Sequence, residues 1–388
     1  MMTSLAYERH GDPAAPSVLL LGSLGSDRRM WSPQIVALSP IADVIAVDHR
    51  GHGESDSAAG AYTVAELAGD VLTLLDELGV DAVHVVGLSL GGAVGQWLAA
   101  HRPERVRSLT LLCTAAVFEP AQQWRDRAET VLADGAGSFA EQIVGRWFTA
   151  DLAERDPELV QRHVAMVSAT SDDGYAGCCH ALAGFDGRAD LARIVAPTLV
   201  IAGAQDPATP PDVMRELADG IADADFHVLD PGAHLVNVEQ AGRVTALIRA
   251  HITSSEQVGA YRSAAVEVGM RMRRSVLGDA HVDRAMSQAT AFTEPFQDFI
   301  TRTAWGDIWA RPGLDHHTRR LLTLAILTAV GNEHELDMHI RAALRAGVDP
   351  DELIEVFLHT AVYAGVPNSN RAFAMGKQAL ADLESAGK

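Results

Sequence analysis

The sequence of 388 residues has few cysteines, an excess of acidic over basic residues and no long apolar run. Its three cysteines, with Cys178 and Cys179 adjacent, do not suit a disulfide framework, so a reducing compartment, the cytoplasm, is expected. The formal net charge of −20 argues against nucleic acid or an anionic membrane as a partner. No apolar run approaches the roughly 20 residues of a membrane span, and residues 1–5 lack the pattern of a signal peptide.

Length and hydrophobic pattern predict two domains. A chain of 388 residues with 48% hydrophobic residues is folded and longer than one core usually supports. From 5 to 115, short apolar strands alternate with helical stretches, which predicts a mostly parallel sheet with helices on both faces. Helical segments replace strands at about 118–190 and suggest an inserted cap. Strands then return at 197–203 and 226–229.

The last third of the chain has only helical patterns. Residues 253–257 are polar and non-periodic, so we expect them to link a first domain, 1–252, to an all-α domain, 258–388. The predicted helices of this second domain are 258–275, 281–291, 295–309, 316–330, 333–346, 350–364 and 369–385.

The most informative stretch is Gly-Leu-Ser-Leu-Gly-Gly at 87–92. It follows an apolar, β-branched run and precedes an Ala-rich helical one, which predicts a tight strand-to-helix turn. In such a turn the serine, Ser89, occupies a strained position, and its neighbours must be small. The following helix N-terminus is suited to stabilising an oxyanion.

A serine nucleophile needs a base, and the base needs an acid that orients it. Asp206 and His234 each lie on a loop that follows a predicted strand, in the order Ser–Asp–His along the chain. Asp230 is the competing acid. The N–H groups of Leu90 and Leu24 are the expected oxyanion donors.

These motifs, together with Asp-His-Arg-Gly-His-Gly-Glu-Ser at 48–55, resemble the α/β-hydrolase family. Within it, Ser-Leu-Gly-Ser-Asp at 23–27 and the segment 231–240 resemble the 3-oxoadipate enol-lactonases. His49 and His52 are expected to stabilise a turn by hydrogen bonds rather than to act in catalysis. In the cap, Arg146 is a candidate for binding a substrate carboxylate, beside Trp147; a surface arginine next to a core tryptophan is the alternative.

A second candidate site lies in the helical domain. Its His334 and His339 are five residues apart, roughly 140° around a helix, so they do not form a zinc motif. Glu335 and His339 share a helix face, where a carboxylate is expected to raise the pKa of the imidazole and orient it for proton transfer. An ordinary surface pair is the alternative.

Motifs at 274–279, 305–314 and 363–367 resemble the 4-carboxymuconolactone decarboxylases, which are similar to the alkylhydroperoxidase-D group. That group uses Cys-x-x-Cys-x-x-x-His, but this domain has no cysteine, so acid–base chemistry by Glu335 and His339 remains. Arg274 and Arg319 are candidates for holding substrate carboxylates or an enolate oxygen, with surface salt bridges as the alternative.

The two resemblances imply consecutive reactions on small anionic lactones. Decarboxylation of 4-carboxymuconolactone yields 3-oxoadipate enol-lactone, and hydrolysis of that product yields 3-oxoadipate, in the β-ketoadipate pathway of protocatechuate breakdown. Neither step implies a cofactor or a metal. The resemblance of the second domain also implies a homo-oligomer. The rival interpretation is a general esterase or C–C bond hydrolase with a helical oligomerisation or binding domain.

Overall fold

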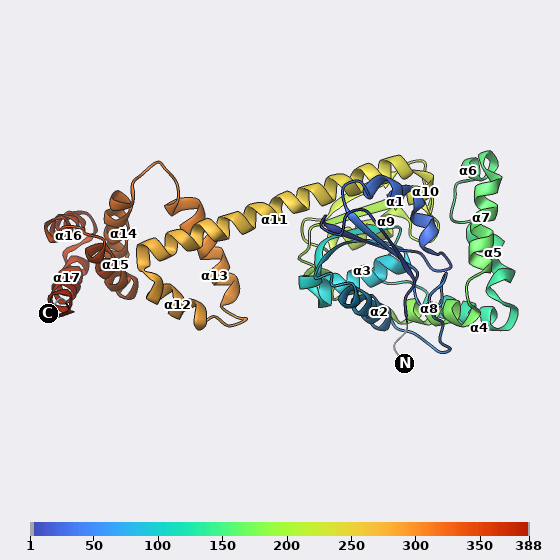
Figure 1. The fold of residues 1–388 in the computed structure, drawn as a ribbon, viewed down its shortest axis with the longest axis horizontal. Coiled ribbons are helices and arrows are strands. Elements are labelled where there is room, and N and C mark those ends of the chain that lie inside the picture. Colours follow the sequence, from blue (N-terminus) through green and yellow to red (C-terminus); the bar gives the residue numbers. More distant parts are fainter. Residues whose placement is uncertain (1–3, 387–388) are drawn as a thin grey trace. The chain divides into compact units, whose positions relative to one another are not determined.

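A computed structural model describes residues 4–386, coloured along the chain in Figure 1. The chain divides into two compact units, Met1–Glu256 and Gln257–Lys388, and each has apolar clusters of its own. Residues 1–3, on which the expectation about a signal peptide partly rests, lie outside the described residues.

The first unit is built on a seven-stranded sheet with strand order β1-β3-β2-β4-β5-β6-β7. Only β1 is antiparallel to its neighbour. β3 and β4 are buried along their whole length, as expected for strands covered on both faces. The strands are β1 (Tyr7–His10), β2 (Ser17–Leu21), β3 (Asp43–Val47), β4 (Val83–Leu88), β5 (Val106–Leu112), β6 (Thr198–Gly203) and β7 (Asp225–Leu229).

The parallel register brings the carboxyl ends of six strands, β2 to β7, to one edge of the sheet. Leu21 pairs with Gly87, Leu88 with Leu112, and Gly203 with Leu229. The loops that follow these strands therefore meet at one edge, where α/β proteins commonly bind ligands.

Helices cover the sheet and form the expected cap. Around the sheet lie η1 (Arg28–Trp31), α1 (Ser32–Leu38), α2 (Val64–Glu77), α3 (Leu90–His101), η2 (Pro103–Arg105), η4 (Leu191–Arg193), α9 (Pro211–Asp219) and α10 (Val236–Glu239). The insertion between β5 and β6 contains α4 (Ala121–Asp134), η3 (Ala136–Phe139), α5 (Ala140–Val144), α6 (Ala150–Arg155), α7 (Pro157–Ser168) and α8 (Asp172–Gly184). In Figure 1, α4 to α7 lie together at one side of the sheet.

The expected linker is helical. Residues 253–257 lie inside α11 (Ala241–Leu277), a single helix of 37 residues. These five residues contain no glycine or proline to end a helix, and the Ser255 hydroxyl donates to the carbonyl oxygen of His251, 2.8 Å away, as serines within helices do. The two units therefore divide inside the predicted linker, between Glu256 and Gln257, but the helix continues through it instead of ending there.

The second unit is helical throughout its regular structure. After α11 come α12 (Asp279–Ser287), α13 (Glu294–Ile300), the π-helix η5 (Thr301–Trp309), α14 (His316–Val330), α15 (Glu333–Arg345), α16 (Pro350–Ala364) and α17 (Val366–Ala386). α14 and α16 have the predicted bounds, whereas the predicted helix 295–309 divides into α13 and the π-helix. None of the described helices combines the length and apolar character that crossing a bilayer requires.

Candidate active sites

Ser89 lies in a strained turn between β4 and α3. Its φ of 55° and ψ of −111° are unusual for a residue other than glycine. The small neighbours are required, because a Cβ on Gly87 would lie 2.3 Å from the Gly91 carbonyl oxygen, and one on Gly91 would lie 2.2 Å from that of Leu21. The turn therefore presents one serine side chain at the start of α3, as the sequence predicted.

Asp206 and His234 form a buried hydrogen-bonded pair. His234 Nδ1 lies 2.8 Å from Asp206 Oδ2, and the aspartate also accepts from Thr209 Oγ1 at 2.6 Å and the Ala208 amide at 2.9 Å. Burial raises the pKa of Asp206, but the His234 ring and these hydrogen bonds outweigh it and lower the pKa to about 2. The carboxylate is ionised at neutral pH, which fixes Nδ1 of His234 as the donor and leaves Nε2 as a base.

Cys113, which follows β5, lies beside this pair. Its sulfur is within 4.8 Å of the polar atoms of Asp206 and His234. Burial raises the pKa of the thiol well above its ordinary value, so Cys113 stays neutral there. Asp230, the competing acid, is exposed.

The loop that follows β2 is held by two buried histidines. Gly25 N–H donates to His52 Nε2 over 2.9 Å, and His52 Nδ1 lies 3.1 Å from a backbone carbonyl oxygen. His49 Nε2 lies 3.1 Å from the Gly22 carbonyl oxygen. Burial lowers the pKa of His52 to about 4 and that of His49 to about 3, so both rings are neutral at pH 7. Their hydrogen bonds fix the backbone on either side of Leu24.

The two expected oxyanion donors are free to bind a ligand. Leu90 is the first residue of α3, where backbone N–H groups have no partner within the helix. Among the hydrogen bonds of the described residues, neither Leu24 N–H nor Leu90 N–H appears as a donor. Leu24 lines the same cavity as Ser89.

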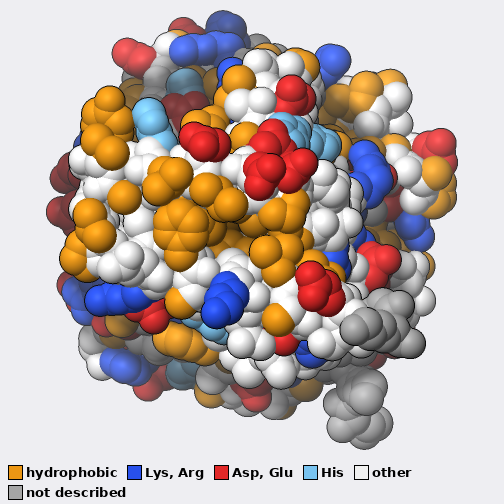
Figure 2. Space-filling model, turned by 90° about the vertical axis from the view of Figure 1, so that its left-hand side faces the viewer, with side chains coloured by type: hydrophobic (Ala, Val, Ile, Leu, Met, Phe, Trp, Pro, Cys, Tyr) orange, Lys and Arg blue, Asp and Glu red, His pale blue; other side chains and the backbone are white. Residues whose placement is uncertain are grey.

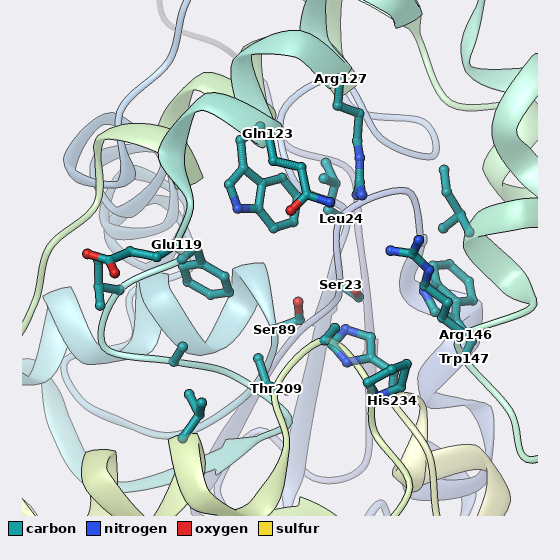
Figure 3. A pocket seen from close by; sticks show the side chains of 18 of the residues that line it. Ser23, Leu24, Ser89, Glu119, Gln123, Arg127, Arg146, Trp147, Thr209 and His234 are labelled. Atoms are coloured by element: carbon teal, nitrogen blue, oxygen red, sulfur yellow. The ribbon is translucent and has the colours of Figure 1, made fainter.

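A cavity of about 570 Å³ lies between this edge of the sheet and the cap. Figure 3 shows Ser89 and His234 at its floor, with Arg146 and Trp147 at one side and Arg127 above. Five of the residues predicted for the first site line this cavity, namely Leu24, Ser89, Arg146, Trp147 and His234, and Asp206 is hydrogen-bonded to His234.

Three arginines line this cavity, and they differ in their partners. Arg188 pairs with Asp186 over 2.6 Å. Among the described residues, Arg127 and Arg146 make no ion pair, and the Arg127 guanidinium lies 4.7 Å from the centre of the Trp124 ring. Sequence reasoning missed Arg127, although its position three residues after Trp124 places both on one side of a helix.

In the second unit, the structure does not pair Glu335 with His339. No hydrogen bond joins them among the described residues, and the Glu335 charge acts on Arg273 and His281 instead. Burial, with Arg320 and His281 nearby, lowers the pKa of His339 to about 4. The expected rise in pKa was therefore wrong, because desolvation and cationic neighbours dominate.

The arginines predicted for this site are both partly exposed. Arg274 pairs with Asp279 at 3.0 Å and Asp283 at 2.7 Å, which matches the salt-bridge alternative. Arg319 donates to backbone carbonyl oxygens and forms no ion pair among the described residues. Their chain neighbours, Arg273 and Arg320, are the buried ones.

Comparison with known proteins supports both family resemblances. A model of the α/β hydrolase fold matches residues 16–241, and one of the carboxymuconolactone decarboxylase family matches 294–378. 3-Oxoadipate enol-lactonase 2 of Acinetobacter baylyi is 40% identical over 61% of this chain and 88% of its own length. 4-Carboxymuconolactone decarboxylase of the same organism is 49% identical over 30% of this chain and 86% of its own length. The chain belongs to both families.

The fold of the α/β-hydrolase unit has a close counterpart among solved structures. The enol-lactonase from Burkholderia xenovorans LB400 superposes with a TM-score of 0.63 at 38% identity, covering 65% of this chain and 97% of that one. The chain is thus a fusion of an α/β-hydrolase unit and a carboxymuconolactone decarboxylase-family unit.

Proposed function

We propose that this chain is a bifunctional enzyme that converts 4-carboxymuconolactone to 3-oxoadipate through 3-oxoadipate enol-lactone. The observation that carries the proposal is the fusion itself. One chain holds units similar to a decarboxylase and to a lactonase, and the product of the first reaction is the substrate of the second. The decarboxylase-family unit would act first, and the hydrolase unit would then act on its product.

In the hydrolase unit, Ser89 is proposed to attack the lactone carbonyl carbon while Nε2 of His234 takes its proton. The amides of Leu24 and Leu90 hold the oxyanion. The ring C–O bond then breaks, His234 protonates the leaving enol oxygen, and the enol becomes the ketone. Water, deprotonated by His234, hydrolyses the ester on Ser89, while Asp206 keeps the imidazole in the required tautomer.

Arg127 and Arg146 are proposed to bind the free carboxylate of the enol-lactone. Both line the cavity that holds Ser89, and guanidinium groups suit carboxylates because they donate two parallel hydrogen bonds. Trp147 is proposed to pack against the lactone from the side of the cavity on which Arg146 lies. The surrounding protein carries a net charge of −20, so these two cations supply the local attraction that an anionic substrate needs.

In the decarboxylase-family unit, loss of CO₂ breaks the bond between the ring carbon and the carboxylate carbon. The electron pair passes through the ring double bond to the lactone carbonyl oxygen, and a proton then returns to carbon. We assign delivery of that proton to His339, with Glu335 near the entrance of the site. His339 is neutral before substrate binds, and the negative charges of the substrate favour its protonation.

The same proposal includes assembly through the second unit and a cytoplasmic location. α14 carries Leu322, Ile326 and Val330, which are 47%, 61% and 69% exposed, and α16 beside it carries an equally spaced apolar series. Figure 2 shows apolar side chains gathered on one face. An exposed apolar stripe of this kind suits contact with a second copy. All three cysteines are buried free thiols, which suits a reducing compartment.

The two activities are tested separately in the full chain. Ser89→Ala should abolish lactone hydrolysis and leave CO₂ release from 4-carboxymuconolactone intact. His339→Gln should do the opposite, and His334→Gln, an exposed histidine on the same helix, serves as its control. Hydrolysis of simple esters without turnover of either lactone would favour the general esterase instead.

A further inference from the structure

Two arginines are buried in the decarboxylase-family unit without a carboxylate partner. Arg273 is 4% exposed and Arg320 is 9% exposed. Arg273 Nη1 donates to Gln297 Oε1 at 2.9 Å and Thr301 Oγ1 at 3.4 Å, while its Nε has no partner among the described residues. Within the described residues, the one hydrogen bond of the Arg320 guanidinium is from Nη1 to the Val276 carbonyl oxygen, at 3.3 Å. Neither guanidinium forms an ion pair within the described part of the chain.

Burying an unpaired guanidinium lowers the folding stability of a protein unless a ligand of opposite charge binds it. Burial lowers the pKa of both guanidinium groups, which reflects the loss of hydration of a charge that stays in place. Buried charges in proteins are normally paired or bound to an ion of opposite charge. The unpaired Nε of Arg273 and the singly bonded Arg320 therefore indicate donors kept for an anion.

Both arginines lie beside the same part of α11. Arg320, on α14, donates to the carbonyl oxygen of Val276, which lies three residues after Arg273 on α11, so Arg320 contacts the turn of α11 that follows Arg273. Val276 packs in a cluster that includes Trp305 and Trp309 of the π-helix. α11 approaches this π-helix closely, because a Cβ on Gly269, one turn before Arg273, would lie 2.0 Å from the Thr301 carbonyl oxygen.

Further titratable side chains interact electrostatically with this pair. The Glu335 charge acts on Arg273 and on His281, and the charges of His281 and Arg320 act on His339. His281, Glu335 and His339 are partly exposed, so the group of side chains extends from the buried arginines to solvent. An anion can therefore approach from that side, beside a neutral His339.

We infer that Arg273 and Arg320 bind the two carboxylates of a dicarboxylate substrate. The inference rests on the proposed decarboxylation and deepens it. A substrate with two carboxylates matches two unpaired guanidiniums, whereas the product, which has lost one carboxylate as CO₂, leaves one of them unpaired again. The site therefore favours the dicarboxylate over the monocarboxylate product, which aids product release.

The test compares each buried arginine with the partly exposed arginine next to it in the sequence. Full chains carrying Arg273→Gln or Arg320→Gln are compared with Arg274→Gln and Arg319→Gln as matched controls. Glutarate, a dicarboxylate that does not react, is measured as a competitive inhibitor of CO₂ release and as a ligand by calorimetry, with monomethyl glutarate beside it. We expect affinity for glutarate to fall about 30-fold or more in the buried variants and less than about twofold in the controls.

A stability measurement separates binding from folding. Arg273→Met and Arg320→Met remove a buried, unpaired charge, so without ligand each should raise the melting temperature or leave it unchanged. Glutarate should raise the melting temperature of the parent but not that of these variants. Parent-like glutarate binding by the buried variants, or no glutarate binding by the parent, would overturn the site. Glutarate binding that depends on both arginines, without any release of CO₂ from the lactone, would support the site and refute the proposed reaction.

Discussion

Replacing His52 should slow lactone hydrolysis without weakening substrate binding. In the parent protein the Gly25 N–H donates to Nε2 of the fully buried His52, 2.9 Å away. In His52→Leu this N–H has no acceptor. Leaving a buried N–H without a partner costs about 1–3 kcal/mol. The loop can recover that energy by moving, and movement displaces the Leu24 amide from the oxyanion. If the transition state bears this cost, kcat falls by about 5-fold to 150-fold.

The assay measures kcat and KM for 3-oxoadipate enol-lactone in the full chain, together with inhibition by phenylboronic acid, which forms a tetrahedral adduct on serine. We expect the inhibition constant to rise by the same factor as kcat falls, with KM changed less than about threefold. His52→Gln, whose amide oxygen is an acceptor, should recover most of the rate, and His227→Leu on the surface serves as the control. A His52→Leu enzyme with the parental kcat would show that His52 does not position the oxyanion loop. Equal losses of kcat in the leucine and glutamine variants would show the same.

Three further predictions concern the cavity, acid stability and assembly. Arg127→Gln and Arg146→Gln should each raise KM for the enol-lactone about tenfold or more, whereas Arg125→Gln, on the same cap helix as Arg127, should leave KM unchanged; KM values equal to that of the parent would exclude the cavity arginines from substrate binding. Burial lowers the pKa of His52 from 6.5 to about 4. The contribution of neutral His52 to folding stability is therefore fully present above pH 6.5, and about 3 kcal/mol of it is lost as the pH falls towards 4. The free energies of unfolding of the parent and His52→Gln, measured in urea, should converge over that range, and a constant difference between them would contradict this prediction. Ile326→Glu should reduce the molar mass in light scattering to that of one chain, and an unchanged mass would exclude this stripe as the interface.

The catalytic triad of the first site was largely predictable because each of its three residues follows a strand. In a parallel sheet, strands that end in register bring Ser89, Asp206 and His234 to one edge, so chain order and strand position suffice. Arg127 was missed because its role depends on how a cap helix faces the cavity. A pattern along the helix does not by itself reveal what lies opposite.

The second site was less predictable because neighbouring helical residues point about 100° apart. The predictions chose Arg274 and Arg319, and the buried residues are Arg273 and Arg320. A signal for Arg273 was available, since it lies four residues after Gly269, on the face that packs closely against the π-helix. The linker prediction located the boundary between the two units, but it missed the helix that runs through it, because polarity alone does not end a helix.

One chain is proposed to perform both reactions in sequence. The decisive measurement gives the purified full chain 4-carboxymuconolactone and follows CO₂ and 3-oxoadipate together. We expect one molecule of 3-oxoadipate for each molecule of CO₂, with the enol-lactone as a transient intermediate that accumulates in Ser89→Ala. Release of CO₂ without 3-oxoadipate, or no release at all, would contradict it.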